Sequence, residues 1–462
     1  MSTEHPPPSR RAFLIHSAQL ASGLATGSAL ASCAAPRAVP VARGRVIGAN
    51  DRINLAVLGI RSRGMQLAKG FAKIPNVRVR TLVDVDENLF ADRVRDMERV
   101  QGVAPGTEWD LRRVLDDPAI DAVAIATPDH WHALATIWAS QAGKHVYVEK
   151  PCCHNLWEGR KMVEAARRYG CLVAVGFQNR SIDAVRAAMK FLHEGGLGEI
   201  YMARGLCFKP RDSIGRRVNE PVPDGVHYDL WLGPAPRRPF NRNHFHYEWH
   251  WNWTYGAGDI GNQGPHQFDI ARWGLGEHEH PRRITSSGGY FKWDSDQQTP
   301  NTQTATLEYA DGKLLQFEVR GLYTNHEDGI RIGNLFFGTE GWMHLNGSSW
   351  KTYFGRKNEP GPSSESAEEY ADPADLAGTG GGGHFANFIH ALRTGDRAKL
   401  TSDIEEGFVS TALPHLANIA YRTGAVLTFD GATERFTGHM AGQANRLLSR
   451  DYREPYVVPR HV

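Results

Sequence analysis

The chain has 462 residues, of which 41% are hydrophobic and 23% charged, so it is long enough for two domains with cores of their own. Its 53 Lys and Arg and 51 Asp and Glu leave a formal net charge of +2, and no basic run occurs, which argues against nucleic-acid binding. Five cysteines without a repeated spacing predict neither a disulfide framework nor a zinc site.

Residues 1–33 have the pattern of an export signal. Ser9-Arg10-Arg11-Ala12-Phe13-Leu14 is a twin-arginine motif, and the weakly apolar run Ile15 to Ala31 behind it is too polar for a transmembrane helix. Leu30-Ala31-Ser32-Cys33 is similar to a lipoprotein cleavage box, which would leave a lipid anchor on Cys33; ordinary cleavage nearby is the alternative. These features predict a periplasmic or exported protein, delivered by the twin-arginine export machinery and membrane-anchored if Cys33 is lipidated. Residues 34–50 predict a linker.

Residues 51–179 predict an NAD(P)-binding Rossmann domain, because apolar strands alternate with helices as in a doubly wound parallel sheet. The expected strands are Asn54–Gly59, Val77–Val83, Asp121–Ala126, His145–Val148 and Leu172–Phe177. Ligands of such sheets bind at the carboxyl ends of the strands. The strand ends at Gly59, Thr127, Glu149 and Gln178 are therefore expected to converge on one rim.

The first turn, Gly59-Ile60-Arg61-Ser62-Arg63-Gly64, lies between a strand and a helix, which is the context of a dinucleotide fingerprint. Arg61 occupies the place of the middle glycine and must point away or contact phosphate itself. Asp84 ends the second strand about 20 residues after Gly64, where a carboxylate bonds the ribose hydroxyls and favours NAD. Its alternative role is to cap the next helix. NADP stays open because Arg61 and Arg63 lie near the ribose. The cofactor contacts predicted here are Gly59, Arg61, Ser62, Arg63, Gly64 and Asp84.

The strand His145–Val148 ends in Glu149-Lys150-Pro151, and Pro151 stops it because proline has no N–H for a sheet hydrogen bond. A lysine at this rim is either a solvated charge or a catalytic group. The residues alone leave both interpretations open.

Residues 180–425 predict an α+β domain with an open, mainly antiparallel sheet, linked by hairpin turns such as Asp311-Gly312. A polar loop is expected at 360–369, and a short strand with an extended tail at 426–462. Helices are expected at Ser181–Glu194, Phe385–Leu392 and, with one apolar face, Ser402–Arg422; strands are expected at Glu199–Cys207, Ile284–Ser287, Thr304–Tyr309, Lys313–Arg320, Ile330–Phe337 and Gly341–Leu345.

The segment from His244 to Trp253 combines aromatic and polar side chains. Aromatic faces stack on the C–H faces of sugars, while His, Asn and Glu bond their hydroxyls. Trp249, His250 and Trp253 are therefore candidate substrate contacts, with a buried strand as the alternative. The histidines of this segment predict no metal site, since no Cys or carboxylate cluster accompanies them.

A glycine-rich run from Gly378 to Gly383 precedes His384 and a helix. Such a run either cradles an anion at the helix N-terminus or acts as a hinge, and both interpretations stay open. His384 is a candidate substrate contact.

The glycine turn, Asp84, Thr127-Pro128 with His132, Glu149-Lys150-Pro151 and the segment around His266 resemble the Gfo/Idh/MocA oxidoreductase family, from Ile53 to about Gly424. The resemblance implies that Lys150 is catalytic and faces the nicotinamide and the reacting sugar carbon. It implies a second domain with a substrate site and often an oligomer interface, so a homo-oligomer is expected. The further cofactor contacts that it implies are Thr127, Pro128, His132, Glu149 and Lys150. Gln178 is a predicted cofactor contact as one of the converging strand ends.

The family's Asp-x-Gly-x-His-x-x-Asp element is matched at Gly264, His266 and Asp269, but Asn262 stands in place of its first Asp. An Asn can hold a hydroxyl but cannot take a proton. His266 is then the acid/base candidate beside Lys150, because the ordinary pKa of imidazole lies near neutrality. A helix cap is the alternative for His266. Asn262 and Asp269 are implied substrate contacts.

The predicted function is nicotinamide-dependent oxidation of a sugar, polyol or glycoside hydroxyl. Twin-arginine export carries folded proteins, and an exported enzyme has no cytoplasmic cofactor pool, so NAD is expected to be tightly bound and recycled. Two alternatives stay open. One is a redox-neutral, NAD-dependent glycoside hydrolase that oxidises sugar C3 and eliminates at C2, and the other is a sugar-binding lipoprotein with an inactive cofactor site.

Overall fold

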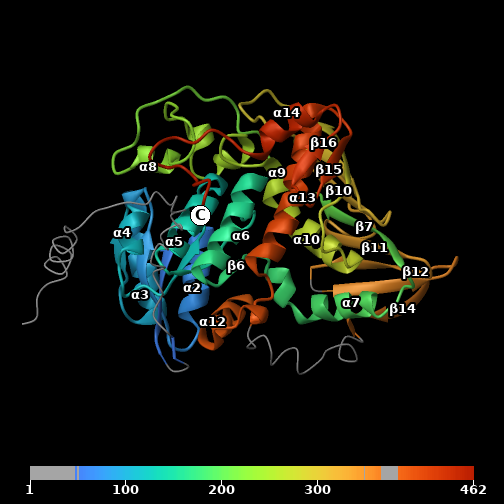
Figure 1. Cartoon of the computed structure of the whole chain (residues 1–462), viewed down its shortest axis with the longest axis horizontal. Coiled ribbons are helices and arrows are strands. Elements are labelled where there is room, and N and C mark those ends of the chain that lie inside the picture. The colour runs from blue at the N-terminus through green and yellow to red at the C-terminus, as the bar shows by residue number, and fades with distance from the viewer. Residues whose placement is uncertain (1–46, 49–50, 348, 366–382) are drawn as a thin grey trace, which may run out of the picture. The chain divides into compact units, whose positions relative to one another are not determined.

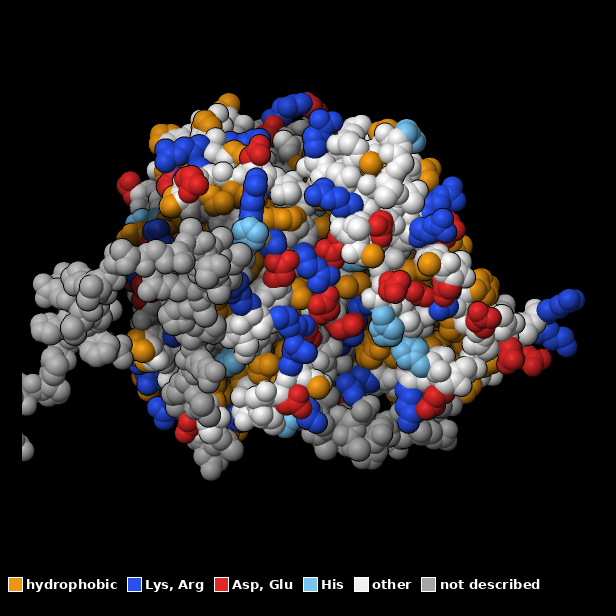
Figure 2. All heavy atoms as spheres, in the orientation of Figure 1, with side chains coloured by type: hydrophobic (Ala, Val, Ile, Leu, Met, Phe, Trp, Pro, Cys, Tyr) orange, Lys and Arg blue, Asp and Glu red, His pale blue; other side chains and the backbone are white. Residues whose placement is uncertain are grey.

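The computed structural model describes residues 47–48, 51–347, 349–365 and 383–462. The predicted export signal with Cys33, nearly all of the linker and the glycine-rich run up to residue 382 lie outside them. Within these ranges no helix is long and apolar enough to cross a membrane. On the face in Figure 2, the described Lys and Arg side chains are interspersed with Asp and Glu rather than gathered into one basic patch.

The N-terminal half forms a sheet of six parallel strands in the order β3-β2-β1-β4-β5-β6, which confirms the predicted parallel sheet. The strand order reverses between β1 and β4, the switch point at which doubly wound sheets bind ligands. Helices α5 and α6 lie side by side along this sheet (Figure 1). The elements are β1 Ile53–Leu58, α2 Arg63–Ala72, β2 Val77–Val83, α3 Phe90–Gln101, β3 Gly106–Glu108, α4 Leu111–Leu115, β4 Ala122–Ile125, α5 Asp129–Gln141, β5 His145–Val148, α6 Leu156–Tyr169 and β6 Val173–Val175.

The C-terminal half forms a ten-stranded sheet in the order β14-β13-β12-β11-β7-β10-β9-β8-β15-β16. All neighbouring strands are antiparallel except β7 and β10, which confirms the predicted open, mainly antiparallel sheet. Its strands are β7 Ile200–Cys207, β8 Arg283–Gly289, β9 Thr302–Glu308, β10 Leu314–Arg320, β11 Ile332–Gly338, β12 Gly341–Asn346, β13 Ser349–Phe354, β14 Glu359–Ser363, β15 Leu427–Asp430 and β16 Arg435–Thr437. The helices of this half are α7 Asp183–His193, α8 Tyr228–Leu232, α9 Gly258–Asn262, α10 Gly264–Leu275, α12 His384–Thr394, α13 Ile404–Thr423 and α14 Ala441–Asn445.

Strands β3, β13 and β14 were not predicted from the sequence. Residues 359–363 form β14 rather than part of a loop, in spite of Pro360 and Pro362. An edge strand tolerates proline because one of its sides makes no sheet hydrogen bonds. Strand β3 has three residues, two of them exposed, and so lacks the apolar run that marks a buried strand.

The C-terminal tail is more structured than the predicted strand and extended segment. Strand β15 pairs with β8 and β16 with β15, so the tail completes the second sheet. Its last residues then reach the first half of the chain, where the ring of Tyr456 lies 5.6 Å from that of Trp131 and 6.3 Å from that of Trp138. In Figure 1 the chain accordingly ends beside α5.

Helix α13 is buried on every face along residues 407–420, whereas the sequence analysis expected an amphipathic helix. It packs against α6 and β6 of the first half and against α10, β8 and β9 of the second. Small residues allow the close approach: a Cβ at Gly159 of α6 would lie 2.2 Å from the ring of Phe408, and one at Gly407 would lie 2.2 Å from Val175. The helix is thus a common core element of both halves.

We expect Gly159→Ala to destabilise the protein by about 1–3 kcal/mol, because the added methyl group overlaps the Phe408 ring and the Cys153 Sγ. Gly442→Ala in α14 is the matched control, since its added Cβ would meet nothing within 4 Å. The measurement is the free energy of unfolding from urea denaturation of both variants. Equal stability of the two variants would contradict the close packing of α6 on α13.

Candidate active site

A cavity of about 580 Å³ lies at the carboxyl ends of β1, β2, β4 and β5, between the two halves of the chain. The four strand ends at Gly59, Thr127, Glu149 and Gln178 meet there as expected. Four predicted site residues, Gly64, Trp253, Asp269 and His384, are not part of its lining. The predicted residues that line it are Gly59, Arg61, Ser62, Arg63, Asp84, Thr127, Pro128, His132, Glu149, Lys150, Gln178, Trp249, His250, Asn262 and His266.

The turn after β1 requires glycine at both of its ends. Gly59 has a φ of +82°, and a Cβ there would lie 2.6 Å from the carbonyl oxygen of Ala126. A Cβ at Gly64 would lie 1.8 Å from the carbonyl oxygen of Gly59. Gly64 therefore permits the tight turn but does not line the cavity. Arg61 and Ser62, between the two glycines, do line the cavity.

Asp84 is held at the rim by the backbone. Its carboxylate accepts hydrogen bonds from the N–H of Ile60 at 2.8 Å and of Asp86 at 3.0 Å. Burial nevertheless raises the pKa of Asp84 to about 6, against the effect of these N–H groups. The carboxylate is thus fixed between the glycine turn and the end of β2, the place expected for a ribose-binding group.

His132 ties together two segments that border the cavity. Its ring nitrogens lie 2.8 Å from the carbonyl oxygen of Thr127 and 2.7 Å from that of Pro151. Burial lowers the pKa of His132, so the neutral ring has one N–H and donates to one of these two carbonyl oxygens at a time. The hydroxyl of Thr127 is buried and has no hydrogen-bond partner among the described residues, so it is available to a ligand in the cavity.

Lys150 joins the two halves of the chain at the cavity. Its Nζ donates a hydrogen bond to the carbonyl oxygen of Asn262 at 2.5 Å. The preceding Glu149 forms an ion pair with Arg63 of the glycine turn at 2.8 Å and accepts a hydrogen bond from Gln178 at 3.2 Å. Burial lowers the pKa of Lys150 from its ordinary value, opposed by the charges of Glu149 and Asp129. An amine with a lowered pKa is better able to accept a proton.

The pKa of His266 differs from the near-neutral value that the sequence predicts. Burial, followed by the positive charges of Lys150 and Arg63, lowers its pKa well below the ordinary range. The imidazole is therefore neutral at pH 7, and its Nδ1 is buried without a partner among the described residues. The ordinary pKa of histidine was not a guide here because the ring is enclosed beside cations. This favours Lys150 as the proton acceptor and His266 as a neutral hydrogen-bonding group.

The aromatic segment forms two short 3₁₀ turns, Arg242–His244 and Glu248–Trp251, instead of a strand. The rings of Trp249 and His250 stack 3.6 Å apart at the cavity, and the Nδ1 of His250 lies 2.6 Å from the carbonyl oxygen of Tyr247. Trp253 lies away from the lining, with its ring 5.1 Å from the guanidinium of Arg422. Among the described residues no group of His, Cys, Asp and Glu is arranged to hold a metal ion.

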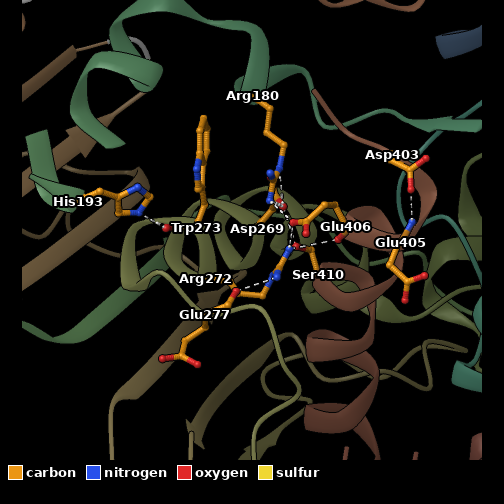
Figure 3. Close-up of polar contacts among 10 residues, drawn as sticks. All are labelled: Arg180, His193, Asp269, Arg272, Trp273, Glu277, Asp403, Glu405, Glu406 and Ser410. Carbon is orange, nitrogen blue, oxygen red and sulfur yellow. Dashed lines mark hydrogen bonds and ion pairs between the residues drawn. The ribbon is translucent and has the colours of Figure 1, made fainter. Parts of the chain in front are cut away.

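Asp269 lies in a buried ionic network behind the cavity (Figure 3). Its carboxylate accepts hydrogen bonds from the Nε and the Nη2 of Arg180, both at 2.8 Å, and one from the hydroxyl of Ser410 at 2.6 Å. Arg272 donates to Ser410 and to Glu406 in turn. Because the side chain of Asp269 is 1% exposed, its charge needs these partners and is directed to them instead of to a substrate.

His384 is likewise engaged elsewhere. Its Nε2 lies 3.0 Å from the carbonyl oxygen of Val175, and its Nδ1 lies 3.0 Å from the hydroxyl of Ser181. The ring thereby fastens the start of α12 to the end of β6. This placement gives it a structural contact and no access to the cavity.

Several lining residues were not singled out from the sequence. Trp109 follows the short strand β3, Trp231 belongs to α8 and Tyr456 to the tail, so only folding brings these rings together. Asp129 and Lys209 are lining charges that act electrostatically on Lys150. Asp129 did carry a signal, since it directly follows the Thr127-Pro128 turn.

Comparison with known proteins agrees with this geometry. Residues 53–177 match the oxidoreductase family, NAD-binding Rossmann fold, and residues 214–458 match the oxidoreductase family, C-terminal alpha/beta domain, which are the two parts of Gfo/Idh/MocA proteins. The chain belongs to the Gfo/Idh/MocA oxidoreductase family. The glycine turn, Asp84 and the unpartnered Thr127 hydroxyl of this family member fit the dinucleotide NAD.

Two curated relatives match part of the Gfo/Idh/MocA chain. Levoglucosan dehydrogenase of Pseudarthrobacter phenanthrenivorans is 41% identical over 96 residues, which cover 21% of this chain and 25% of the relative. A glycosyl hydrolase family 109 protein of Shewanella pealeana is 29% identical over 169 residues, covering 34% of this chain and 37% of the relative. The matches thus span well under half of these relatives.

A solved structure extends the likeness to most of the fold. The WlbA dehydrogenase from Bordetella pertussis, in complex with NADH and UDP-GlcNAcA, has a TM-score of 0.59 at 20% identity and covers 82% of this chain and 99% of its own. At that identity the similarity establishes a common fold.

We expect Asp269→Asn to destabilise the protein by about 3–5 kcal/mol, because it leaves the buried guanidinium of Arg180 without its main counter-charge. Asp92→Asn removes an exposed partner of Arg95 and serves as the control, with little change expected. Urea denaturation of both variants provides the measurement. An Asp269→Asn protein as stable as the control would show that the network of Figure 3 contributes little to stability.

Proposed function

We propose that the protein is an NAD-dependent oxidoreductase that oxidises a hydroxyl of a sugar, polyol or glycoside. The observation that carries this proposal is the placement of Lys150. Its Nζ lies 2.5 Å from the carbonyl oxygen of Asn262, in a cavity that the Rossmann turn and an aromatic segment share. The relationship to levoglucosan dehydrogenase supports a carbohydrate substrate.

The proposed chemistry divides the work between the two halves of the chain. Residues of the glycine turn, Asp84 and Thr127 hold the cofactor, and bound NAD supplies the hydride acceptor. Lys150, as a neutral amine, takes the proton of the substrate hydroxyl, and neutral His266 hydrogen-bonds to the same oxygen. The stacked rings of Trp249 and His250 provide a flat surface for a sugar ring.

A redox-neutral, NAD-dependent glycoside hydrolase is the second candidate. The partial match to a glycosyl hydrolase family 109 protein favours it, and so does Asn262, which replaces a carboxylate of the usual family element. The same scaffold can serve both reactions, since transient oxidation at sugar C3 is the first step of the second. The third class, a sugar-binding protein with an inactive cofactor site, is disfavoured by the presence of both Lys150 and His266 in the cavity.

A panel of levoglucosan, inositols and methyl glycosides, incubated with the purified protein, distinguishes the two enzymatic candidates. We expect the absorbance of reduced nicotinamide to rise with an active substrate, without release of reducing sugar. Sugar release without net nicotinamide reduction would instead establish the hydrolase. Absence of both signals from every compound would favour the binding protein.

Replacement of Lys150 provides a prediction for the proton transfer. We expect Lys150→Met to lower kcat/KM about 10²–10⁴-fold, because the proton acceptor is lost, while NADH still binds by fluorescence titration. In the wild type kcat/KM is expected to rise with pH through the pKa of Lys150. Since burial lowers that pKa, the rise ends at a lower pH than for an exposed lysine. A Lys150→Met protein with full turnover would contradict the assignment.

The export prediction leads to a proposal about the cofactor. We infer that the twin-arginine machinery delivers the folded chain to the periplasm, with or without a lipid on Cys33. The exported protein retains NAD tightly and recycles it with a second substrate. It assembles as a homo-oligomer. The motif at Arg10-Arg11 supports the export route, and the lining of the cavity by residues of both halves supports tight binding of NAD. Nucleotide released on gentle denaturation of washed protein is the expected result. Protein without nucleotide would contradict tight binding, and a Cys33→Ser variant that stays at the membrane would exclude the lipid anchor.

A further inference from the structure

Four carboxylates line the cavity, and three of them are already engaged. Asp84 accepts hydrogen bonds from backbone N–H groups, Asp110 accepts bonds from Arg112 at 2.7 to 3.0 Å, and Glu149 forms an ion pair with Arg63. The fourth is Asp129. Within the described ranges no hydrogen bond or ion pair within 4.0 Å is made by its side chain.

Asp129 is an unusual first residue for a helix. An acidic residue in the first turn ordinarily lies at the surface, where it interacts with the helix dipole. Asp129 begins α5 but is only 3% exposed, and the N-cap of the helix is Pro128, which supplies no side-chain cap. A buried carboxylate without a partner is costly, so its retention needs a reason other than helix stability.

Lys150 is the cation that acts electrostatically on this carboxylate. Each of the two groups acts electrostatically on the other, and both line the cavity. Burial raises the pKa of Asp129 and lowers the pKa of Lys150, so the proton affinities of the two groups approach each other. Matched proton affinities are what efficient proton transfer between two groups requires.

The side chain at position 262 supplies no proton acceptor for Lys150. Asn262 holds the ammonium through its backbone carbonyl, but its side-chain amide cannot take a proton. His266 is neutral and enclosed by positive charge, which disfavours its protonation. A carboxylate elsewhere in the cavity would speed the return of the lysine to its neutral form after it has taken a substrate proton.

We propose that Asp129 is the proton acceptor of Lys150, and that it supplies from the start of α5 the carboxylate that position 262 lacks. The proposal rests on the oxidoreductase function above. The substrate O–H bond breaks and its proton passes to the Lys150 amine, while the C–H bond breaks with its electron pair transferred to NAD and the C=O bond forms. The ammonium then gives a proton, through intervening water, to the Asp129 carboxylate, which releases it to bulk water.

The test uses the full-length protein with bound NAD and the member of the carbohydrate panel that the wild type oxidises. We expect Asp129→Asn to lower the rate of nicotinamide reduction about 10²-fold, and Asp129→Glu to retain more activity than Asp129→Asn. NADH affinity and the thermal unfolding midpoint are expected to stay close to those of the wild type. Asp183→Asn is the matched control, because Asp183 is also the first residue of a helix, α7, but is exposed.

Chemical rescue separates a proton acceptor from a merely structural carboxylate. We expect sodium formate to restore the rate of Asp129→Ala at least about tenfold in a dose-dependent manner, with no effect on Asp183→Ala. An Asp129→Asn rate within threefold of the wild type, or an Asp129→Ala rate that formate does not raise, would overturn the proposal. These results require an active wild type. A wild type that reduces no nicotinamide would instead refute the proposed oxidation itself, and the relay with it.

Discussion

The hydrogen bond from Lys150 to the carbonyl oxygen of Asn262, at 2.5 Å, joins the end of β5 to the end of α9. It holds the half-buried Lys150 side chain at the cavity, where the charges of Glu149 and Asp129 act on it. The neighbouring carboxylate of Glu149 is bound by Arg63 of the glycine turn and by Gln178, which also bonds the hydroxyl of Tyr147 at 2.9 Å. The cofactor turn and the reactive lysine therefore belong to one hydrogen-bonded unit. A change in the turn is therefore expected to affect the lysine, and a change in the lysine to affect the turn.

A second ionic network holds two of the elements that line the cavity in place. Arg180 lies two residues after Gln178, and its partner Asp269 lies three residues after His266, so the ion pair of Figure 3 anchors both elements just behind the cavity. Ser410 and Glu406 extend the network to α13, the helix that packs against both halves. Removing one member of a buried pair is strongly destabilising. The role of Asp269 is therefore to pair with Arg180, and not to bind a substrate.

Apart from β3, the parallel strands were predicted closely because they appear as short apolar runs, and β4 and β6 are buried along their whole length. β2 and β5 have the predicted bounds, and the alternation of β9 and β10 follows one buried face of the second sheet. Strands β13 and β14 and the packing of the tail escaped prediction because their stability comes from pairing with residues distant in the chain. The buried character of α13 escaped for the same reason: its polar residues His415 and Asn418 bond to other elements instead of facing water.

By itself, the sequence determined the fold class, the glycine turn, the acidic end of β2 and the convergence of Lys150 with the strand ends. Each of these follows from local patterning and from the geometry of parallel sheets. Only the tertiary structure decided which polar residues face the cavity. His266 and Asp269 lie within one helical turn of each other, yet one faces the cavity and the other is paired with Arg180. In the sequence Asp129 is only the residue after Thr127-Pro128, whereas folding buries it at the cavity that Lys150 also lines. Burial and long-range partners set the charge and direction of a side chain, and neither is encoded in its immediate neighbours.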